Sequence, residues 1–383
     1  MNRFFGVFLS FLISVGAGGM ARAQTYTSLS CGLPSPGITD TVPYTVPGTT
    51  RMRQLDIAIA EPTGLPAGVT LPLPAVIWSH GGATGGGIGN LADWRAATTE
   101  ACYVSVTIGH TWPRKKVSKE VCEDVFELAD PSFCGTQAGS VKMLSYLRPH
   151  DIAAVITHLE NAYPGLVDPT KIVVGGHSGG AGGAMMVAGA TRAFRSGDMN
   201  QDFIEVMDLS DTRPIAFIAL SPQGPGVDGF FEGWKQGGET SWDAVDRPVY
   251  VGTGAGDNGC DQNPRSTSSS TIHFCSNLGP VPSNRKAVFD FLPAGAPGSE
   301  NKYRYFIDDW RAAHTIFKLS NNTCVSGGGQ TQDAQCALMF DGLKQTVSAF
   351  LDWHVRSDPL AEAFLADTPN IPGPPGLVSW DRK

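Results

Sequence analysis

The sequence predicts an α/β protein with a mostly parallel, doubly wound sheet flanked by helices. Short apolar runs typical of strands alternate with helix-like stretches, and the middle runs are continuously apolar, as in strands buried on both faces of a parallel sheet. The chain has 383 residues, of which 42% are apolar and 17% charged. It is therefore long enough for one large domain and too weakly charged for a disordered protein.

Strands are expected at residues 54–60, 75–79, 102–108, 171–175, 214–220, 248–252 and 303–307. Helices are expected at residues 91–99, 150–162, 179–194 and 335–353. The Pro-rich tail that begins at Asp358 is expected to run over the surface. Two connections, at about 111–147 and 222–246, are longer than αβ loops require and follow strands, so we expect insertions at the carboxyl edge of the sheet, where ligands bind. The alternative is surface decoration.

The first 23 residues have the pattern of a secretory signal peptide. Arg3 precedes an apolar run at residues 4–15, and Ala21-Arg22-Ala23 offers an A-x-A cleavage site. This run is shorter than the roughly 20 residues that span a bilayer, and no later segment is longer and as apolar. We therefore expect cleavage near Ala23 and a secreted or periplasmic single domain over residues 24–383.

The formal net charge of the whole chain is −8. Loss of the signal peptide, which holds Arg3 and Arg22 and no acidic residue, lowers it by two, to −10. The sequence therefore lacks the basic footprint of a nucleic-acid-binding protein, and an anionic membrane surface is not expected as a partner.

All eight cysteines follow the signal peptide, and an even number in an exported chain indicates disulfides. No C-x-x-C motif and no Cys/His pair with zinc spacing is present. Pairs close in sequence predict local bridges, and elimination leaves one long-range bridge. The expected bridges are Cys122–Cys134, Cys260–Cys275, Cys324–Cys336 and Cys31–Cys102.

The most informative motif is Gly176-His177-Ser178-Gly179-Gly180, which fits G-x-S-x-G. An apolar strand precedes it and an Ala/Gly/Met-rich helix follows, which is the context in which this motif presents a nucleophilic serine on a tight turn. The flanking glycines remove side chains that would collide in such a turn. A phosphate-binding loop is the competing interpretation, but its glycine and lysine patterns are missing here.

With this motif, the chain resembles the α/β-hydrolases, and more narrowly the exported dienelactone-hydrolase-like and platelet-activating-factor-acetylhydrolase-like esterases. The resemblance extends over roughly residues 55–352. It rests on Trp78-Ser-His-Gly-Gly82, Arg148-Pro-His-Asp151, residues 176–180, Ser221-Pro-Gln-Gly224, Thr253-Gly-Ala-Gly-Asp257 and the region of His314. Dienelactone hydrolase itself uses a cysteine, where this chain has Ser178. The resemblance implies an α/β-hydrolase fold, here with disulfide-stapled loop insertions at the active-site edge.

The other triad members should follow in the order Ser, acid, His. Asp257 ends the glycine-rich turn after a predicted strand, where the resemblance places the acid; Asp261 is the alternative, and a plain turn-forming role for Asp257 also remains open. His314 follows the last predicted strand, where the family carries its histidine loop. His273 is the other histidine compatible with this order.

An oxyanion hole is expected from the backbone N–H of Gly179 and a second N–H in the loop at residues 79–83. Gly82 is preferred as the second donor, with Ala83 as the alternative. The sequence thus predicts a secreted serine esterase that cleaves small-molecule or polymeric carboxylic esters through an acyl-enzyme and needs no cofactor or metal.

Three loop tryptophans near the site, Trp112, Trp242 and Trp310, suggest an aromatic-lined cleft, although ordinary packing explains them equally well. The alternatives to a simple esterase are a polyester-degrading enzyme of the cutinase or PET-hydrolase kind, a serine peptidase on the same fold, and a binding protein built on an inactive hydrolase scaffold. The sequence does not indicate an oligomeric state.

Overall fold

The computed structural model describes residues 26–35, 37–82, 87–110, 123–125, 137–194, 205–224, 241–257, 284–296, 298–319, 324–326, 329–367 and 371–383. Several sequence predictions fall outside these ranges. They concern the signal peptide, Ala83, Trp112, Cys122, Cys134, Cys260, Asp261, His273 and Cys275.

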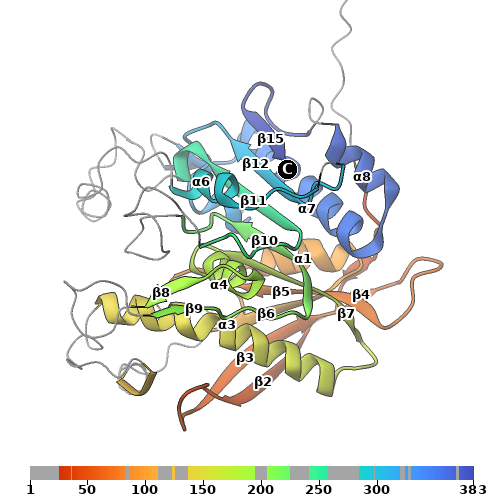
Figure 1. Cartoon of the computed structure of the whole chain (residues 1–383). Coiled ribbons are helices and arrows are strands. Elements are labelled where there is room, and N and C mark those ends of the chain that lie inside the picture. The colour runs from red at the N-terminus through yellow and green to blue at the C-terminus, as the bar shows by residue number, and fades with distance from the viewer. Residues whose placement is uncertain are drawn as a thin grey trace, which may run out of the picture.

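A nine-stranded sheet with the order β15-β12-β11-β10-β7-β5-β6-β3-β2 forms the centre of the fold (Figure 1). The strands from β12 to β6 pair in parallel, whereas β15, β3 and β2 are antiparallel to their neighbours. The predicted mostly parallel sheet is therefore confirmed. The bounds are β2 Ile38–Thr45, β3 Met52–Ala60, β5 Leu73–Ser79, β6 Val104–Gly109, β7 Val167–His177, β10 Pro214–Leu220, β11 Val249–Gly254, β12 Lys302–Ile307 and β15 Val378–Arg382.

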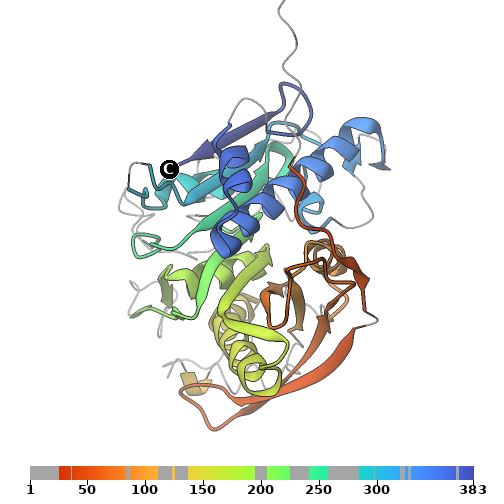
Figure 2. The same cartoon turned by 90° about the vertical axis from the view of Figure 1, so that its right-hand side faces the viewer.

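Helices cover both faces of this sheet because successive strand side chains point to opposite sides. Ile77 packs into one hydrophobic cluster and its neighbour Trp78 into the other. Helices α3 (Gln137–Ala162), α4 (Gly179–Ala188) and α6 (Asn284–Phe291) contribute to the first cluster. The second cluster includes α1 (Ala92–Glu100), α7 (Ala334–Arg356) and α8 (Pro359–Ala366), and the last two lie together in Figure 2.

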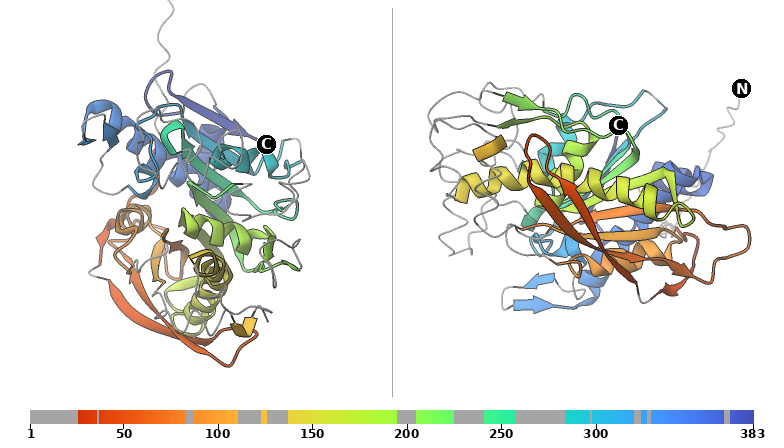
Figure 3. Two further views of the ribbon diagram at one scale, coloured as in Figure 1. Left: turned by 90° about the vertical axis from the view of Figure 1, so that its left-hand side faces the viewer. Right: turned by 90° about the horizontal axis from the view of Figure 1, so that it is seen from below.

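Short two-stranded sheets are present in addition to the main sheet. They are β1 (Gly32–Pro34) with β4 (Pro62–Thr63), β8 (Arg192–Phe194) with β9 (Glu205–Met207), and β13 (Cys324–Ser326) with β14 (Gly329–Thr331). Figure 3 shows the long helix α3 lying against the hairpin β2–β3. None of the helices in the described ranges has the length and hydropathy needed to span a lipid bilayer.

The four cysteines in the described ranges form the disulfides Cys31–Cys102 and Cys324–Cys336, as predicted. The first ties the N-terminal segment to the turn before β6, and the second ties β13 to the first turn of α7. Disulfides persist in oxidising compartments outside the cytosol, so both bridges are compatible with an extracellular protein.

The C-terminal prediction was wrong, because the tail does not merely cover the surface. Asp358 caps α8 by accepting a hydrogen bond from the N–H of Leu360, and Pro359 occupies the first turn, where its missing N–H is harmless. Phe364 is buried, and β15 then pairs with β12 along its whole length. The proline-containing tail therefore forms a short amphipathic helix and an edge strand of the main sheet.

Two helix boundaries also differ from the prediction. The helix expected at 179–194 ends at Ala188, because Gly189 adopts a φ of 119° and closes it in a left-handed cap. Helix α3 starts at Gln137, inside the range expected as an insertion, and continues through Pro149.

Candidate active site

Ser178 occupies a sharp turn between β7 and α4. Its φ of 56° and ψ of −122° are strained for a residue with a side chain, and such strain concentrates at functional sites. The turn requires glycine on both sides. A Cβ on Gly176 would lie 2.3 Å from the backbone of Gly180, and one on Gly180 would lie 1.9 Å from the carbonyl oxygen of Ser79. Ser178 is half-buried, so its hydroxyl belongs to a turn that solvent reaches.

Asp257 lies directly after β11, in the short 3-10 helix η3 (Ala255–Asp257), and its carboxylate is fully buried. The Oδ1 atom lies 2.8 Å from Nδ1 of His314. The hydroxyls of Ser221 and Thr253 donate to Oδ1 and Oδ2 over 2.8 and 2.9 Å. The structure thus brings the predicted acid and base together, with a carboxylate whose lone pairs are well satisfied.

Ser221 and Arg285 complete the surroundings of the acid, and the sequence analysis assigned neither a role. The Ser221 oxygen lies 2.5 Å from Nδ1 of His314, so this nitrogen faces both Ser221 and Asp257. Arg285 donates to the carbonyl oxygen of Ser221 and lies 3.5 Å from Oδ1 of Asp257. Ser221 directly follows the neighbouring strand β10 and has a φ of 51°, so it is a second strained residue beside the acid.

His314 lies beside the nucleophile turn. Nε2 of His177 donates to the carbonyl oxygen of His314 over 2.8 Å, and the two imidazole centroids are 4.5 Å apart. Burial, reinforced by His314, lowers the pKa of His177 well below its ordinary value, so this histidine is a neutral support. Within the described ranges, the imidazole of His314 makes its hydrogen bonds to Ser221 and Asp257 and none to the Ser178 hydroxyl. Because Nδ1 of His314 faces the acid, Nε2 is the nitrogen left for Ser178.

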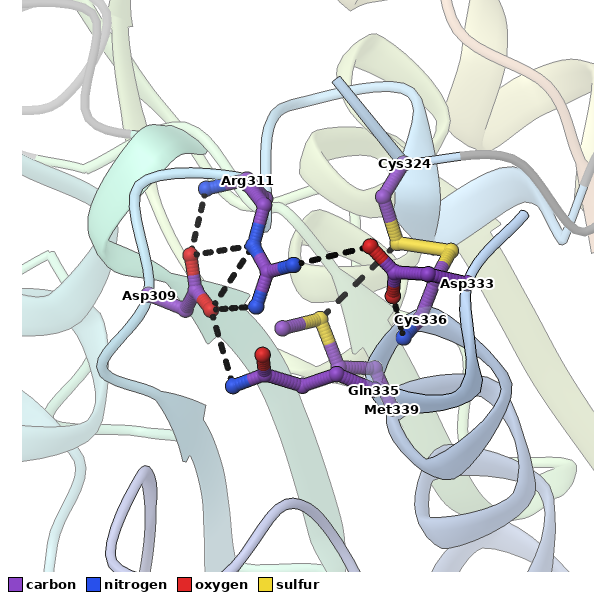
Figure 4. Close-up of a disulfide and its surroundings, with 7 residues drawn as sticks. All are labelled: Asp309, Arg311, Cys324, Asp333, Gln335, Cys336 and Met339. Carbon is purple, nitrogen blue, oxygen red and sulfur yellow. Dashed lines mark hydrogen bonds and ion pairs between the residues drawn. A yellow bond between two sulfur atoms is a disulfide. The ribbon is translucent and has the colours of Figure 1, made fainter. Parts of the chain in front are cut away.

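The loop that carries His314 is anchored on both sides. Before it, Arg311 pairs with Asp309 over 2.6 Å and with Asp333 over 3.1 Å (Figure 4). Asp333 in turn caps α7 by accepting from the N–H of Cys336, half of the disulfide drawn beside it. After it, the carbonyl of Phe317 accepts from the Trp94 indole over 2.8 Å. These contacts hold a loop that carries the predicted base.

The predicted oxyanion loop lies against the nucleophile. A Cβ on Gly81 would lie 2.6 Å from Cβ of Ser178, so only glycine allows this approach. Gly82 has a φ of 82°, a left-handed conformation that also favours glycine. Gly179 opens α4, and the first N–H groups of a helix have no partner within it. Two separate elements, the loop through Gly81 and the start of α4, therefore meet at Ser178.

Comparisons of the chain with models of known protein families and with curated proteins found no match. The functional argument therefore depends on the geometry of the site. Among the described residues, no three histidine, cysteine, aspartate or glutamate side chains are grouped as a metal ion would require.

A hydrogen-bonded chain of a serine, a histidine and an aspartate lies beneath the loop. Oγ of Ser79 is 2.7 Å from Nε2 of His110, and Nδ1 of His110 is 2.8 Å from Oδ2 of Asp151. All three residues are buried, with exposures of 3% or less. Ser79 ends a buried strand and is fully inaccessible, so it is not placed to attack a substrate.

No sequence motif singled out His110, and Arg148-Pro-His-Asp151 entered only as part of the resemblance. Burial and the charge of Arg148 lower the pKa of His110 to about 3, which keeps it neutral. Burial alone would raise the pKa of Asp151, but the charge of Arg53 and hydrogen bonds from His110 and Arg53 hold it below its ordinary value. The arrangement is a neutral imidazole fixed by an ionised carboxylate.

The three tryptophans that were considered for an aromatic-lined cleft lie in different environments. Trp242 is fully buried and stacks on Phe291 at 5.9 Å, so the packing interpretation holds and it does not line a cleft. Trp310 is 51% exposed and precedes His314 by four residues. Trp112 lies outside the described ranges.

Proposed function

We propose that this chain is a secreted serine hydrolase of the α/β-hydrolase fold that cleaves carboxylic esters. Ser178 is the nucleophile, His314 the base and Asp257 the acid, with Gly179 and Gly82 as oxyanion donors. The observation that carries the proposal is the strained strand-to-helix turn at Ser178 beside a hydrogen-bonded Asp257–His314 pair. These residues follow β7, β11 and β12, three parallel strands of one sheet, and occur in the order Ser, Asp, His.

The catalytic steps follow from the hydrogen bonds. The buried carboxylate of Asp257 accepts from Nδ1 of His314, which leaves Nε2 unprotonated and able to accept the Ser178 proton as the hydroxyl attacks the ester carbonyl. Backbone N–H groups stabilise the tetrahedral oxyanion. His314 then protonates the leaving alcohol, and water, activated by the same imidazole, releases the acid from the acyl-enzyme.

A polyester substrate is the second candidate, and the exposed side chain of Trp310 supports it. An exposed tryptophan four residues before the base gives an aromatic or polymeric ester a flat apolar surface to bind. Trp310→Ala should then reduce release of soluble products from a polyester film much more than turnover of p-nitrophenyl acetate. Equal losses on both substrates would argue against a polymer.

The proposed function is tested by hydrolysis of p-nitrophenyl acetate, butyrate and octanoate. We expect Ser178→Ala to lose about 10⁴- to 10⁶-fold in kcat. Asp208→Ala, on the exposed segment that precedes β10, is the control and should retain wild-type rates. Ester turnover that survives in Ser178→Ala would overturn the proposal. If the folded wild-type protein hydrolyses none of these esters, the result would favour a serine peptidase or a binding protein on an inactive hydrolase scaffold.

A further inference from the structure

Arg148 is a buried cation that contacts the oxyanion loop at several points. Its guanidinium donates to the carbonyl oxygens of His80 and, over 2.8 Å, Gly82, and to Oγ of Ser79 over 3.3 Å. A hydrogen bond to one carbonyl fixes the whole planar peptide group that contains it. Contacts to two carbonyls therefore fix the orientation of the loop that lies against Ser178.

The same side chain lies beneath the start of α4. A Cβ on Gly179 would lie 3.7 Å from Nε of Arg148, and one on Gly183 would lie 3.0 Å from its Cβ. Residues four apart share one helix face, so these two glycines together make room for the arginine. Arg148 is thus in contact with both elements that should supply the oxyanion donors.

A buried guanidinium without a carboxylate partner is costly. In the described part of the chain, no carboxylate lies within ion-pair distance of Arg148, and burial lowers its pKa to about 10. The nearest compensating charge is Asp151, which hydrogen-bonds Arg53 through both oxygens over 2.7 and 2.9 Å. His110 is neutral, so two cations and one anion leave a net positive charge under the loop.

The polarity of the hydrogen bonds is fixed throughout this cluster. The ionised carboxylate of Asp151 only accepts, so Nδ1 of His110 donates to it. Nε2 of the neutral imidazole must then accept, and the Ser79 hydroxyl donates to it. The Ser79 oxygen is left to accept from Arg148, which has donors only. Asp151 therefore orients Arg148, which contacts the loop, through His110 and Ser79.

We propose that Arg148 is a positioning residue of the oxyanion hole, held by Asp151, His110 and Ser79, and that its charge stabilises the tetrahedral oxyanion. This inference rests on the proposed function, because the charge matters to catalysis only where an oxyanion forms. It explains why a costly buried cation occupies this place. In the resting protein Arg148 has no anionic partner within ion-pair distance, and the oxyanion of the transition state supplies a negative charge nearby.

The test compares Arg148→Met and Arg148→Lys with Arg247→Met. Arg247 is a matched control because it also donates to backbone carbonyls, those of Val187 and Ala188, at the opposite end of α4. We expect Arg148→Met to lower kcat on p-nitrophenyl butyrate about 100- to 1,000-fold with KM within about threefold. Inhibition by an alkylboronic acid, whose adduct is a tetrahedral anion, should weaken by a similar factor. Arg148→Lys should be intermediate in both.

Arg247→Met should lose thermal stability and keep its kcat. A kcat of folded Arg148→Met within twofold of wild type, or a change confined to KM, would refute the inference. If Arg148→Met does not fold, Arg148→Lys carries the test instead, and an Arg148→Lys kcat within twofold of wild type would also count against the proposal.

A readout without substrate separates this inference from the proposed function. Amide hydrogen exchange of residues 73–82 should be faster in Arg148→Met than in Arg247→Met, whether or not the protein cleaves esters. Equal exchange would refute the positioning role. Faster exchange in a protein that turns over no ester would leave the positioning role standing and overturn only the proposed chemistry.

Discussion

Replacement of Asp257 with asparagine changes the charge of the site without changing its shape. The carboxylate is fully buried and lies 2.8 Å from Nδ1 of His314. An amide presents either a neutral oxygen or an N–H group to that nitrogen. In the second case His314 takes the tautomer with its proton on Nε2, and it can no longer accept the Ser178 proton.

The expected loss in kcat is about 10³- to 10⁴-fold, the size found where the buried triad carboxylate of a known serine hydrolase is neutralised. Stability should also fall, because Arg285, 3.5 Å from Oδ1 and 18% exposed at its side chain, loses its anionic partner. We expect a loss of about 1–3 kcal/mol in the free energy of unfolding for the charged hydrogen bonds that are broken.

The assay is kcat and KM for p-nitrophenyl butyrate, with urea unfolding of the same samples. Asp211→Asn is the matched control, since Asp211 pairs with Arg213 over 2.6 Å before β10, at the end of that strand opposite to Ser221. It should lose stability and keep its kcat. An Asp257→Asn variant that retains more than a tenth of wild-type kcat would refute the role given to the acid.

Three further predictions concern neighbouring parts of the fold. Gly81→Ala should lower kcat at least 100-fold, because its Cβ would lie 2.6 Å from Cβ of Ser178, whereas Gly87→Ala, with open space around it, should not. Cys336→Ser should lower the free energy of unfolding by about 2–3 kcal/mol in urea titrations, because its bridge closes a short loop, and no change would contradict this. Burial lowers the pKa of His354 to about 3, so stability should fall as pH drops below about 6.5, where the unfolded histidine gains a proton and the folded one does not. Between pH 6.5 and 5, the loss in the free energy of unfolding measured with urea should be about 2 kcal/mol smaller in His354→Leu than in the wild type. An equal loss in both proteins would contradict the assignment of His354 as neutral in the folded state.

The parallel part of the sheet was predictable because its strands are continuous apolar runs with glycine-rich or polar ends. The two edge strands of the sheet were harder to predict. Strand β2, in which only Val42 is buried, and the tail strand β15 carry mixed polar sequences whose pairing depends on their neighbours. Helix α8 was missed because Pro359 resembled a breaker and acts as an N-terminal helix residue.

The site was predictable where a local pattern marks it and unpredictable where only the fold makes the contact. The turn at Ser178 is encoded by adjacent glycines, and Asp257 and His314 each follow an apolar strand. The contacts of Ser221 with His314, and of Arg148 with the carbonyl of Gly82, join residues 93 and 66 positions apart in the chain. No periodicity links such pairs, so only the three-dimensional packing identifies them.

The most direct test of the account is mass-spectrometric mapping of the chain after reaction with a fluorophosphonate. In the described part of the chain, Ser79 belongs to a buried Ser-His-Asp chain of hydrogen bonds, whereas Ser178 occupies a half-buried turn beside the Asp257–His314 pair. The proposed mechanism predicts a single adduct on Ser178 that disappears in His314→Ala and persists in Ser79→Ala. An adduct on Ser79, or a folded wild-type chain that stays unmodified, would contradict it.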